Sequence, residues 1–168
     1  MSIDDYIPAF LSLNTAKRMG QVAPHKAVML LSVIDLIENG AISTSSFQLS
    51  EALESKFLQN WKRYVGSSLL FKPVPATPFW HLGSESIWSL FRLDGKPLTE
   101  ITETPSLSKL RSCGITASLD KDLFSLLHSE NNRAVIRTTL VSKYLNGHPQ
   151  VRKVLPITLG FVATRLWI

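Results

Sequence analysis

The sequence contains one cysteine, Cys113, in 168 residues. A single thiol cannot form an internal disulfide, and a cysteine-rich zinc site needs several thiolates. The longest apolar stretch, residues 27–37, is interrupted by Ser32 and Asp35 and is shorter than the about 18 residues of a membrane-spanning helix. The first five residues, Met-Ser-Ile-Asp-Asp, show no signal-peptide pattern. We therefore expect a cytoplasmic protein without disulfides.

The sequence also lacks the short motifs of common catalytic sites. It has no glycine-rich phosphate loop, no dinucleotide-binding fingerprint and no nucleophile elbow. Its four histidines, His25, His81, His128 and His148, lie far apart and follow no metalloprotease pattern. A site assembled from distant residues stays open, because spatial neighbours are invisible in a sequence. The sequence itself predicts no catalytic residue, no metal and no cofactor.

The charge balance is basic. Lysine and arginine total 18 against 13 for aspartate and glutamate, which gives a formal charge of +5. An excess of cations favours a polyanionic partner such as DNA, RNA or an acidic membrane surface. Net charge also serves solubility, so the excess alone does not identify a partner.

Helical periodicity predicts a mainly helical chain. Residues 24–38 form the clearest helix, because Pro24 suits a first turn and the residues after it are apolar nearly all round. Asn39-Gly40 is a common helix end. Further helices are expected over residues 3–13, 50–64, 105–112, 120–129 and 131–145.

Strand patterns are fewer and shorter. Residues 79–82 and 86–93 predict a β-hairpin joined by Gly83-Ser84-Glu85. Strand alternation would bury Trp80 and Leu82 and leave Phe79 and His81 exposed. Other short extended segments are expected over residues 42–49 and 115–119.

Loops are expected over residues 14–23, 65–78 and 94–104, where glycine, proline and polar residues gather. The chain shows no internal repeat and no composition shift that would mark a domain boundary. The sequence therefore predicts one α+β domain over residues 1–168, mainly helical, with a small β-hairpin or short sheet.

Three segments are candidates for contacts with an anion or a base. Ala23-Pro24-His25-Lys26 begins the central helix, where free N–H groups favour phosphate, and Lys17-Arg18 and Gly20-Gln21 precede it. In the alternative interpretation His25 binds a neighbouring loop and Lys26 is solvated. The other two segments are the aromatic residues 77–82, suited to stacking on bases or to the core, and Ser106 to Ser112, suited to phosphate contacts or to solvent.

Together these segments resemble the sulfur-binding domain of McrA-like type IV restriction endonucleases, which recognise phosphorothioate-modified DNA. Pro-His-Lys before an apolar helix is moderately specific, and its combination with Pro-Phe-Trp-His-Leu is much more so. The resemblance spans residues 5–146. The matching segments are Ala23-Pro24-His25-Lys26 running into Leu30-Leu31, the helix with Trp61, Pro78-Phe79-Trp80-His81-Leu82, Ser86-Ile87-Trp88, Ala117-Ser118-Leu119-Asp120 and residues 133–144.

The resemblance implies an apolar surface cup that receives the sulfur of phosphorothioated double-stranded DNA. In the family this cup includes a Tyr-Pro pair, and the corresponding pair here is Thr77-Pro78. The proline ring is retained without the aromatic wall, so Phe79 and His81 are expected to complete the cup.

The resemblance also implies basic contacts around the cup. Val22 replaces the family's arginine ahead of Pro-His-Lys, and Arg18 or Gln21 would substitute for it. Arg111 is the expected second basic contact. Family members pair this domain with an HNH nuclease, whose motif does not occur in these residues, so a separate nuclease domain or subunit is an expected partner. The implied DNA-binding residues are Arg18, Gln21, His25, Lys26, Lys109, Arg111 and Ser112.

Two other functions stay open at this point. A winged-helix-like regulator would read unmodified DNA with the helix over residues 131–145, which carries Arg133, Arg137 and Lys143. An enzyme or a protein-interaction module would have no role with nucleic acid. Retention on DNA at low salt separates the DNA-binding functions from the last class.

Overall fold

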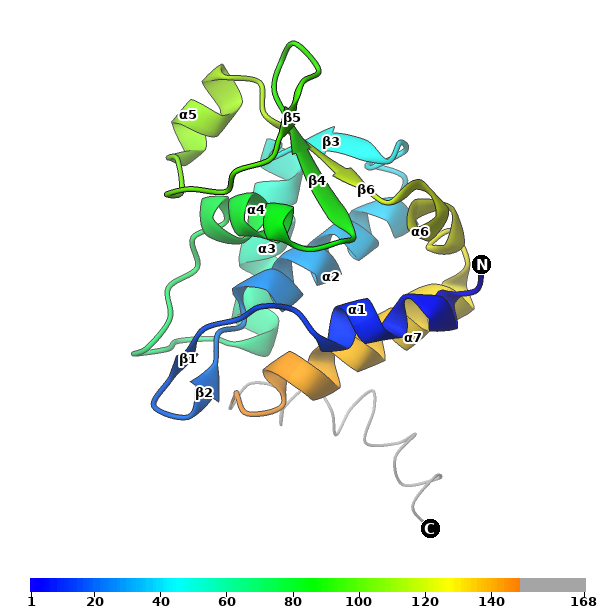
Figure 1. Cartoon of the computed structure of the whole chain (residues 1–168). Coiled ribbons are helices and arrows are strands. Elements are labelled where there is room, and N and C mark those ends of the chain that lie inside the picture. The colour runs from blue at the N-terminus through cyan, green and yellow to red at the C-terminus, as the bar shows by residue number, and fades with distance from the viewer. Residues whose placement is uncertain (149–168) are drawn as a thin grey trace.

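The computed structural model describes residues 1–148, and helix α2 (His25–Glu38) runs through their centre (Figure 1). Eleven of its 14 residues are buried, as expected for a helix that is apolar nearly all round. Helix α3 (Glu51–Tyr64) and helix α7 (Glu130–Leu140) pack against α2. Helix α1 (Ile7–Leu11) packs against α7, which continues as the π-helical turn η3 (Val141–Leu145).

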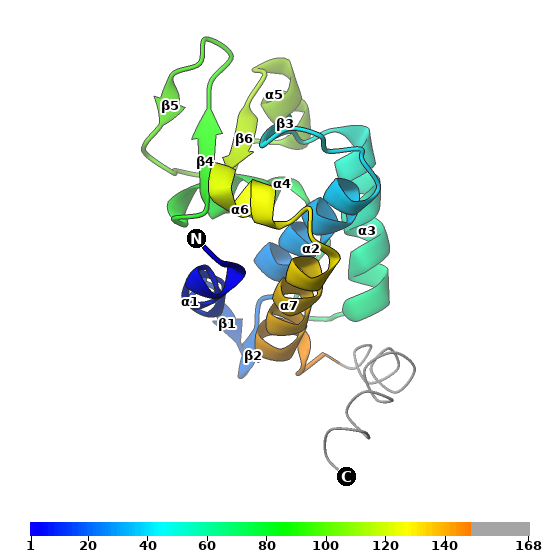
Figure 2. The ribbon, with the colours of Figure 1, turned by 90° about the vertical axis from the view of Figure 1, so that its right-hand side faces the viewer.

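A four-stranded antiparallel sheet lies at one end of these helices (Figures 1 and 2). The strand order is β3 (Ser46–Gln48), β6 (Thr116–Leu119), β4 (Trp88–Phe91) and β5 (Pro97–Leu98). Alternate residues of β4 and β6 are buried, because one face of the sheet covers the helices. The other short elements are η1 (Ile3–Asp5), α5 (Leu107–Ser112) and α6 (Lys121–Leu126).

Side-chain caps explain where several helices begin. Ser50 Oγ accepts from the N–H of Leu53 at 3.1 Å and starts α3. Asp120 Oδ1 accepts from the N–H of Leu123 at 3.0 Å and starts α6. Such caps satisfy N–H groups that have no partner within the helix. The predicted positions of these two helices are therefore confirmed.

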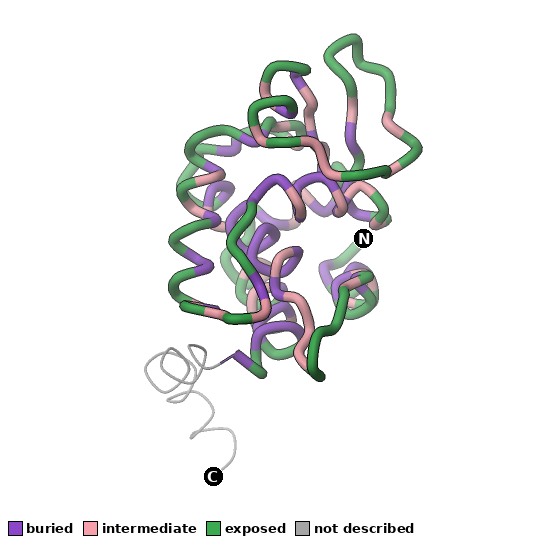
Figure 3. Tube along the Cα trace, turned by 90° about the vertical axis from the view of Figure 1, so that its left-hand side faces the viewer, coloured by how far each residue is buried: buried purple, intermediate pink, exposed green. Residues whose placement is uncertain are grey.

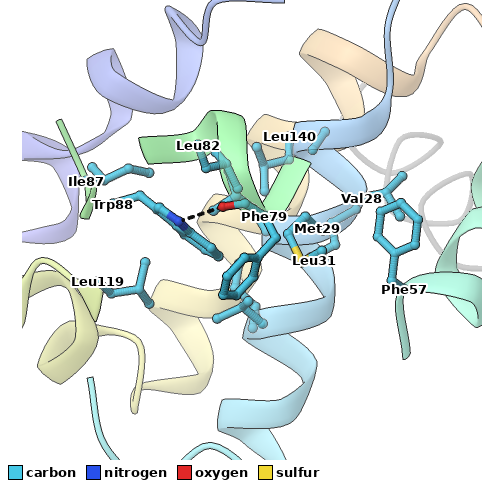
Figure 4. Packing of buried hydrophobic residues seen from close by; sticks show 14 of the residues in the cluster. Val28, Met29, Leu31, Phe57, Phe79, Leu82, Ile87, Trp88, Leu119 and Leu140 are labelled. Carbon is cyan, nitrogen blue, oxygen red and sulfur yellow. Dashed lines mark hydrogen bonds between the residues drawn. The ribbon is translucent and has the colours of Figure 1, made fainter. Parts of the chain in front are cut away.

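The core joins the sheet to α2 through two large aromatic side chains (Figure 4). The Trp88 indole N–H donates to the Phe79 carbonyl at 3.1 Å, and the rings meet edge to face at 5.7 Å. Both side chains are almost fully buried. Figure 3 shows buried positions throughout α2, while most turns are exposed.

The predicted strand over residues 79–82 is wrong. Residues Ala76–His81 form helix α4, followed by the 3-10 turn η2 (Leu82–Ser84). Pro75 takes the N-cap position of α4, where its lack of an N–H costs nothing. The helix turns Phe79 into the core, so its predicted exposure is also wrong. The hairpin that does form joins β4 to β5 through Asp94-Gly95.

A second hairpin lies within residues 14–23, which were expected to form a loop. Strands β1 (Lys17–Arg18) and β2 (Gln21–Val22) pair in antiparallel register around Met19-Gly20. Both turn residues have positive φ, +50° for Met19 and +79° for Gly20. For a residue with a side chain this conformation costs about 1–2 kcal/mol, so the turn at Met19 is strained.

The described residues confirm the predicted fold class: they form a mainly helical α+β fold with two small sheets. The strands expected within residues 42–49 and 115–119 are present as β3 and β6. Of the described helices, none is long and apolar enough to cross a membrane. Predictions for the tail beyond residue 148 lie outside the described residues.

Candidate nucleic-acid interface

A cleft of about 460 Å³ lies between the first turn of α2, the segment that precedes the β1–β2 hairpin, and α4. We call it the α4 cleft. It mixes apolar groups with histidines and cations in a single hollow. Its lining residues are Asn14, Thr15, Ala16, Arg18, Ala23, His25, Lys26, Phe71, Thr77, Pro78, His81 and Ser84.

His25 forms the wall of the cleft at the start of α2. Its Nε2 lies 2.7 Å from the carbonyl oxygen of Lys72, and its ring packs 4.8 Å from Trp61. Burial lowers the pKa of His25 below 6.5, against the opposing effect of the Lys72 carbonyl. A carbonyl oxygen can only accept, so the Nε2–H of His25 donates to Lys72. This is the loop contact left open by the sequence, and it makes His25 a packed wall residue.

Lys26 points into a buried ion pair. Its Nζ lies 2.6 Å from Oε2 of Glu85, and the two side chains are only 10% and 12% exposed. The same carboxylate oxygen accepts from the N–H of Asn14 at 2.9 Å. Lys26 was expected to be solvated or to bind phosphate, but the structure places its charge against Glu85.

Arg18 is exposed at the mouth of the cleft. Its Nη1 donates to the Leu70 carbonyl at 3.0 Å, and its guanidinium lies 5.9 Å from the centre of the Phe71 ring. These contacts orient the group and use only one of its N–H directions. Gln21, the alternative substitute, does not line the cleft, and its amide donates to the Gly147 carbonyl at 3.1 Å.

Helix α4 supplies Thr77, Pro78 and His81 to the cleft. Pro78 and His81 are three positions apart and therefore lie on one face of the helix. Pro78 is buried but contributes to the cleft wall. The His81 Nε2 lies 2.7 Å from the Thr104 hydroxyl oxygen. Burial lowers the pKa of His81, and the nearby charge of Lys26 lowers it further.

The pattern of the family described as "ScoMcrA-like, DNA sulfur-binding domain" matches residues 3–157. The chain belongs to this family. The resemblance predicted from Pro24-His25-Lys26 and the residues of α4 is thus confirmed.

Two solved structures share the fold of this family member. One is the sulfur-binding domain of SprMcrA complexed with phosphorothioated DNA, at 19% identity and a TM-score of 0.62, over 90% of this chain and 91% of that chain. The other is the sulfur-binding domain of ScoMcrA complexed with phosphorothioated DNA, at 22% identity and a TM-score of 0.65, over 84% and 87%. A search of curated proteins gives no match.

The predicted contacts on α5 lie away from the α4 cleft. Arg111 donates through Nε to the Leu49 carbonyl at 2.9 Å and pairs through Nη2 with Glu54 at 3.0 Å. It therefore joins α5 to α3. Ser112 donates to the Lys109 carbonyl at 3.2 Å. Lys109 is exposed and lines a second cleft, of about 890 Å³, between α5 and the β4–β5 hairpin.

The cations of α7 are used within the fold. Arg137 pairs with Asp35 at 2.7 Å and with Glu38 at 2.8 Å. Arg133 donates to the carbonyls of Leu127 and His128 at 3.0 and 2.9 Å. A recognition helix needs side chains that reach base edges. Arg133 and Arg137 instead bind groups of this protein, so two of the three cations expected to read DNA in the winged-helix alternative are already paired.

Sequence reasoning missed Phe71 and Ala16, which contribute apolar surface to the α4 cleft. Phe71 lies in the proline-rich loop after α3 and packs edge-on to His25 at 5.9 Å. This loop contains other apolar residues, so the aromatic ring of Phe71 was its only signal. Ala16 gave none. Phe79, expected in the cup, is fully buried and does not line the cleft.

Acidification is expected to destabilise this family member before its carboxylates titrate. Burial lowers the pKa values of His25, His81 and His148 below 6.5. Each histidine binds protons more readily when unfolded, so its stabilising effect is complete above about 6.5 and is lost as pH falls below that value. The melting temperature should fall by several degrees between about pH 7.5 and about pH 5.5.

Two variants check the source of this pH dependence. His25→Gln removes one buried titrating ring and should reduce the fall in melting temperature. His128→Gln replaces an exposed histidine and should leave it unchanged. A flat melting temperature across this range would contradict the assignment to the buried histidines.

Proposed function

We propose that this chain reads phosphorothioated DNA by placing the modified phosphate in the α4 cleft. Membership of the DNA sulfur-binding domain family is the observation that carries this proposal. The two solved structures that share its fold are complexes with phosphorothioated DNA. The mixed lining of the α4 cleft supports the same location.

The chemistry of the cleft favours sulfur over oxygen. Pro78, Phe71 and Ala16 offer apolar surface, which attracts a large, polarisable sulfur by dispersion. Oxygen is a stronger hydrogen-bond acceptor and loses more when it leaves water without gaining a donor. The difference for one such group is about 1–3 kcal/mol.

The main donors of the cleft already have partners. The Nε2 atoms of His25 and His81 contact the Lys72 carbonyl and the Thr104 hydroxyl, and the ammonium of Lys26 contacts Glu85. A phosphate oxygen that entered the apolar part would compete for these donors. We therefore assign Thr77, Pro78 and His81 to the sulfur-binding wall, with Phe71 in place of the expected Phe79.

Arg18 supplies the charge for the phosphate. It is exposed at the mouth of the cleft, where its Nη1 donates to the Leu70 carbonyl and its guanidinium lies beside the Phe71 ring. A guanidinium has five N–H donors, so others are left for phosphate oxygens. Guanidinium binds phosphate well in either its oxygen or its sulfur form. Lys26 positions the first turn of α2 beside the cleft through its ion pair with Glu85. Lys109 and Arg111 lie outside the α4 cleft and are assigned no contact with the modified phosphate.

We also propose that binding, without catalysis, is the role of this chain. Among residues 1–148, no group of three histidine, cysteine, aspartate or glutamate side chains is placed to hold a metal ion. DNA held at the α4 cleft would then be cut by a nuclease domain or subunit. The restriction function therefore belongs to the assembly and not to the cleft.

A titration with two duplexes tests the proposed function. One duplex carries a single phosphorothioate, and the other has the same sequence with an ordinary phosphate. We expect about tenfold tighter binding of the sulfur duplex, equivalent to about 1.4 kcal/mol, across several flanking sequences and near physiological salt. Equal affinity in every sequence would reduce the chain to a general DNA binder, and no retention at low salt would exclude DNA as its ligand.

A further inference from the structure

The tip of the β1–β2 hairpin has a residue that the fold does not require. Met19 is 91% exposed, and its φ of +50° is one that side chains disfavour. Two-residue hairpin turns with positive φ strongly prefer Asn-Gly or Gly-Gly. Here an apolar side chain occupies the strained position and is held out in solvent. Backbone strain of this kind clusters at functional sites, which makes Met19 a candidate for contact with a ligand.

The base of the hairpin is fixed beside the α4 cleft. Ala16 and Ala23 both line the cleft, and the N–H of Ala23 donates to the Ala16 carbonyl at 2.8 Å. Arg18 is bound to the Leu70 carbonyl at 3.0 Å, and the His148 ring lies 3.2 Å from the Val22 carbonyl. These contacts hold the base of the hairpin in place, and its turn lies on the side away from α4 (Figure 1).

The dimensions of the hairpin fit the major groove of DNA. A two-stranded ribbon can enter this groove, which is about 12 Å wide and about 8.5 Å deep. Three extended residues from Ala16 to Met19 span about 10 Å, enough for the tip to reach the bases. Lys17 and Arg18 are exposed on the first strand, where they would face the phosphates at the groove edge.

We propose that Met19 contacts base edges in the major groove next to the phosphate held in the α4 cleft. This inference rests on the proposed function and adds a base-reading residue to it. The thioether is apolar and polarisable, so its natural partner is the methyl group of thymine. Met19 therefore adds affinity through the bases, independently of whether the phosphate carries sulfur.

The substitution Met19→Asn should change the affinity for DNA without lowering the stability of the fold. Asparagine suits positive φ, so the melting temperature should stay unchanged or rise. Loss of the apolar base contact should weaken binding about 5–10-fold. The loss should be equal for the sulfur duplex and the unmodified duplex, measured by fluorescence anisotropy, so their affinity ratio should stay that of the wild type.

Leu93→Asn is the matched control. Leu93 is 78% exposed at the β4–β5 hairpin, at the opposite end of the molecule from β1–β2 (Figures 1 and 2). It should bind both duplexes as the wild type does. Wild-type affinity in Met19→Asn, an equal loss in Leu93→Asn, or a lowered melting temperature with the loss of binding would each overturn the role of Met19.

The same titration keeps the two proposals apart. The sulfur-to-oxygen affinity ratio of the wild type tests the proposed function, whereas the change from wild type to Met19→Asn on either duplex tests the hairpin. If the wild type binds both duplexes equally and Met19→Asn binds them more weakly, the preference for sulfur would be contradicted and the contact of Met19 with DNA would be supported. A wild type that binds neither duplex would overturn both.

Discussion

Glu85→Ala should destabilise the protein by about 3–5 kcal/mol, because it leaves the ammonium of Lys26 buried without a counter-charge. The two groups lie 2.6 Å apart and are only 10% and 12% exposed. The substitution also removes the acceptor for the N–H of Asn14. Urea unfolding measures the change in the free energy of unfolding, and thermal unfolding should show a fall of about 10 °C or more.

Two further variants test this explanation. Glu54→Ala removes the carboxylate from the Arg111 pair, whose side chains are 33% and 30% exposed, and should cost about 1 kcal/mol or less. Lys26→Met combined with Glu85→Gln removes both charges and keeps an oxygen for Asn14. This double variant should be more stable than Glu85→Ala. If Glu85→Ala lowers the free energy of unfolding no more than Glu54→Ala does, the prediction is contradicted, and water must solvate the ammonium of Lys26 in the variant.

Pro78→Ala should lower the preference for sulfur-bearing DNA about tenfold, equivalent to about 1.4 kcal/mol. Pro78 lines the α4 cleft, and its ring is the apolar surface assigned to sulfur. Affinity for the unmodified duplex should change little, because Arg18 and the backbone contacts remain. Dissociation constants for the paired duplexes measure both quantities.

The fold should accept this change. Pro78 is in the first turn of α4, which begins at Ala76, where a residue needs no intrahelical donor. Replacing proline by alanine should lower the free energy of unfolding by about 0.4–1 kcal/mol, because alanine gives the unfolded chain more conformational freedom. Pro73→Ala is the control, because Pro73 is exposed and outside the cleft. Equal losses of affinity for both duplexes would place Pro78 away from the sulfur.

Sequence patterns predicted correctly the helices whose ends depend on residues close by in the sequence. Pro24 at the start of α2 and the Ser50 cap of α3 gave both helices to within a residue. The error at residues 79–82 came from treating aromatic residues as strand formers. Phe79 and Leu82 are both fully buried three positions apart, a helical spacing that tertiary packing selected over strand propensity.

The site was harder to predict because its residues meet across long distances in sequence. The charge of Lys26 is cancelled by Glu85, 59 positions away, and Arg111 is held by the Leu49 carbonyl, 62 positions away. Sequence patterns identify cations but not their partners, so both residues were assigned to DNA. Arg18, Thr77, Pro78 and His81 do line one cleft, and their contacts with DNA and sulfur stay a prediction.

Tyr144 connects the two ends of the described chain. Its hydroxyl accepts from the N–H of Leu13, 131 positions away, and donates to the Phe10 carbonyl. Helix α1 leaves the ribosome before α7 and η3, so these contacts form only after residue 144 has been synthesised. Closures over such separations are slow. The segment that leads into the β1–β2 hairpin is therefore secured late in biosynthesis, and an incomplete chain would present an unfinished reading surface.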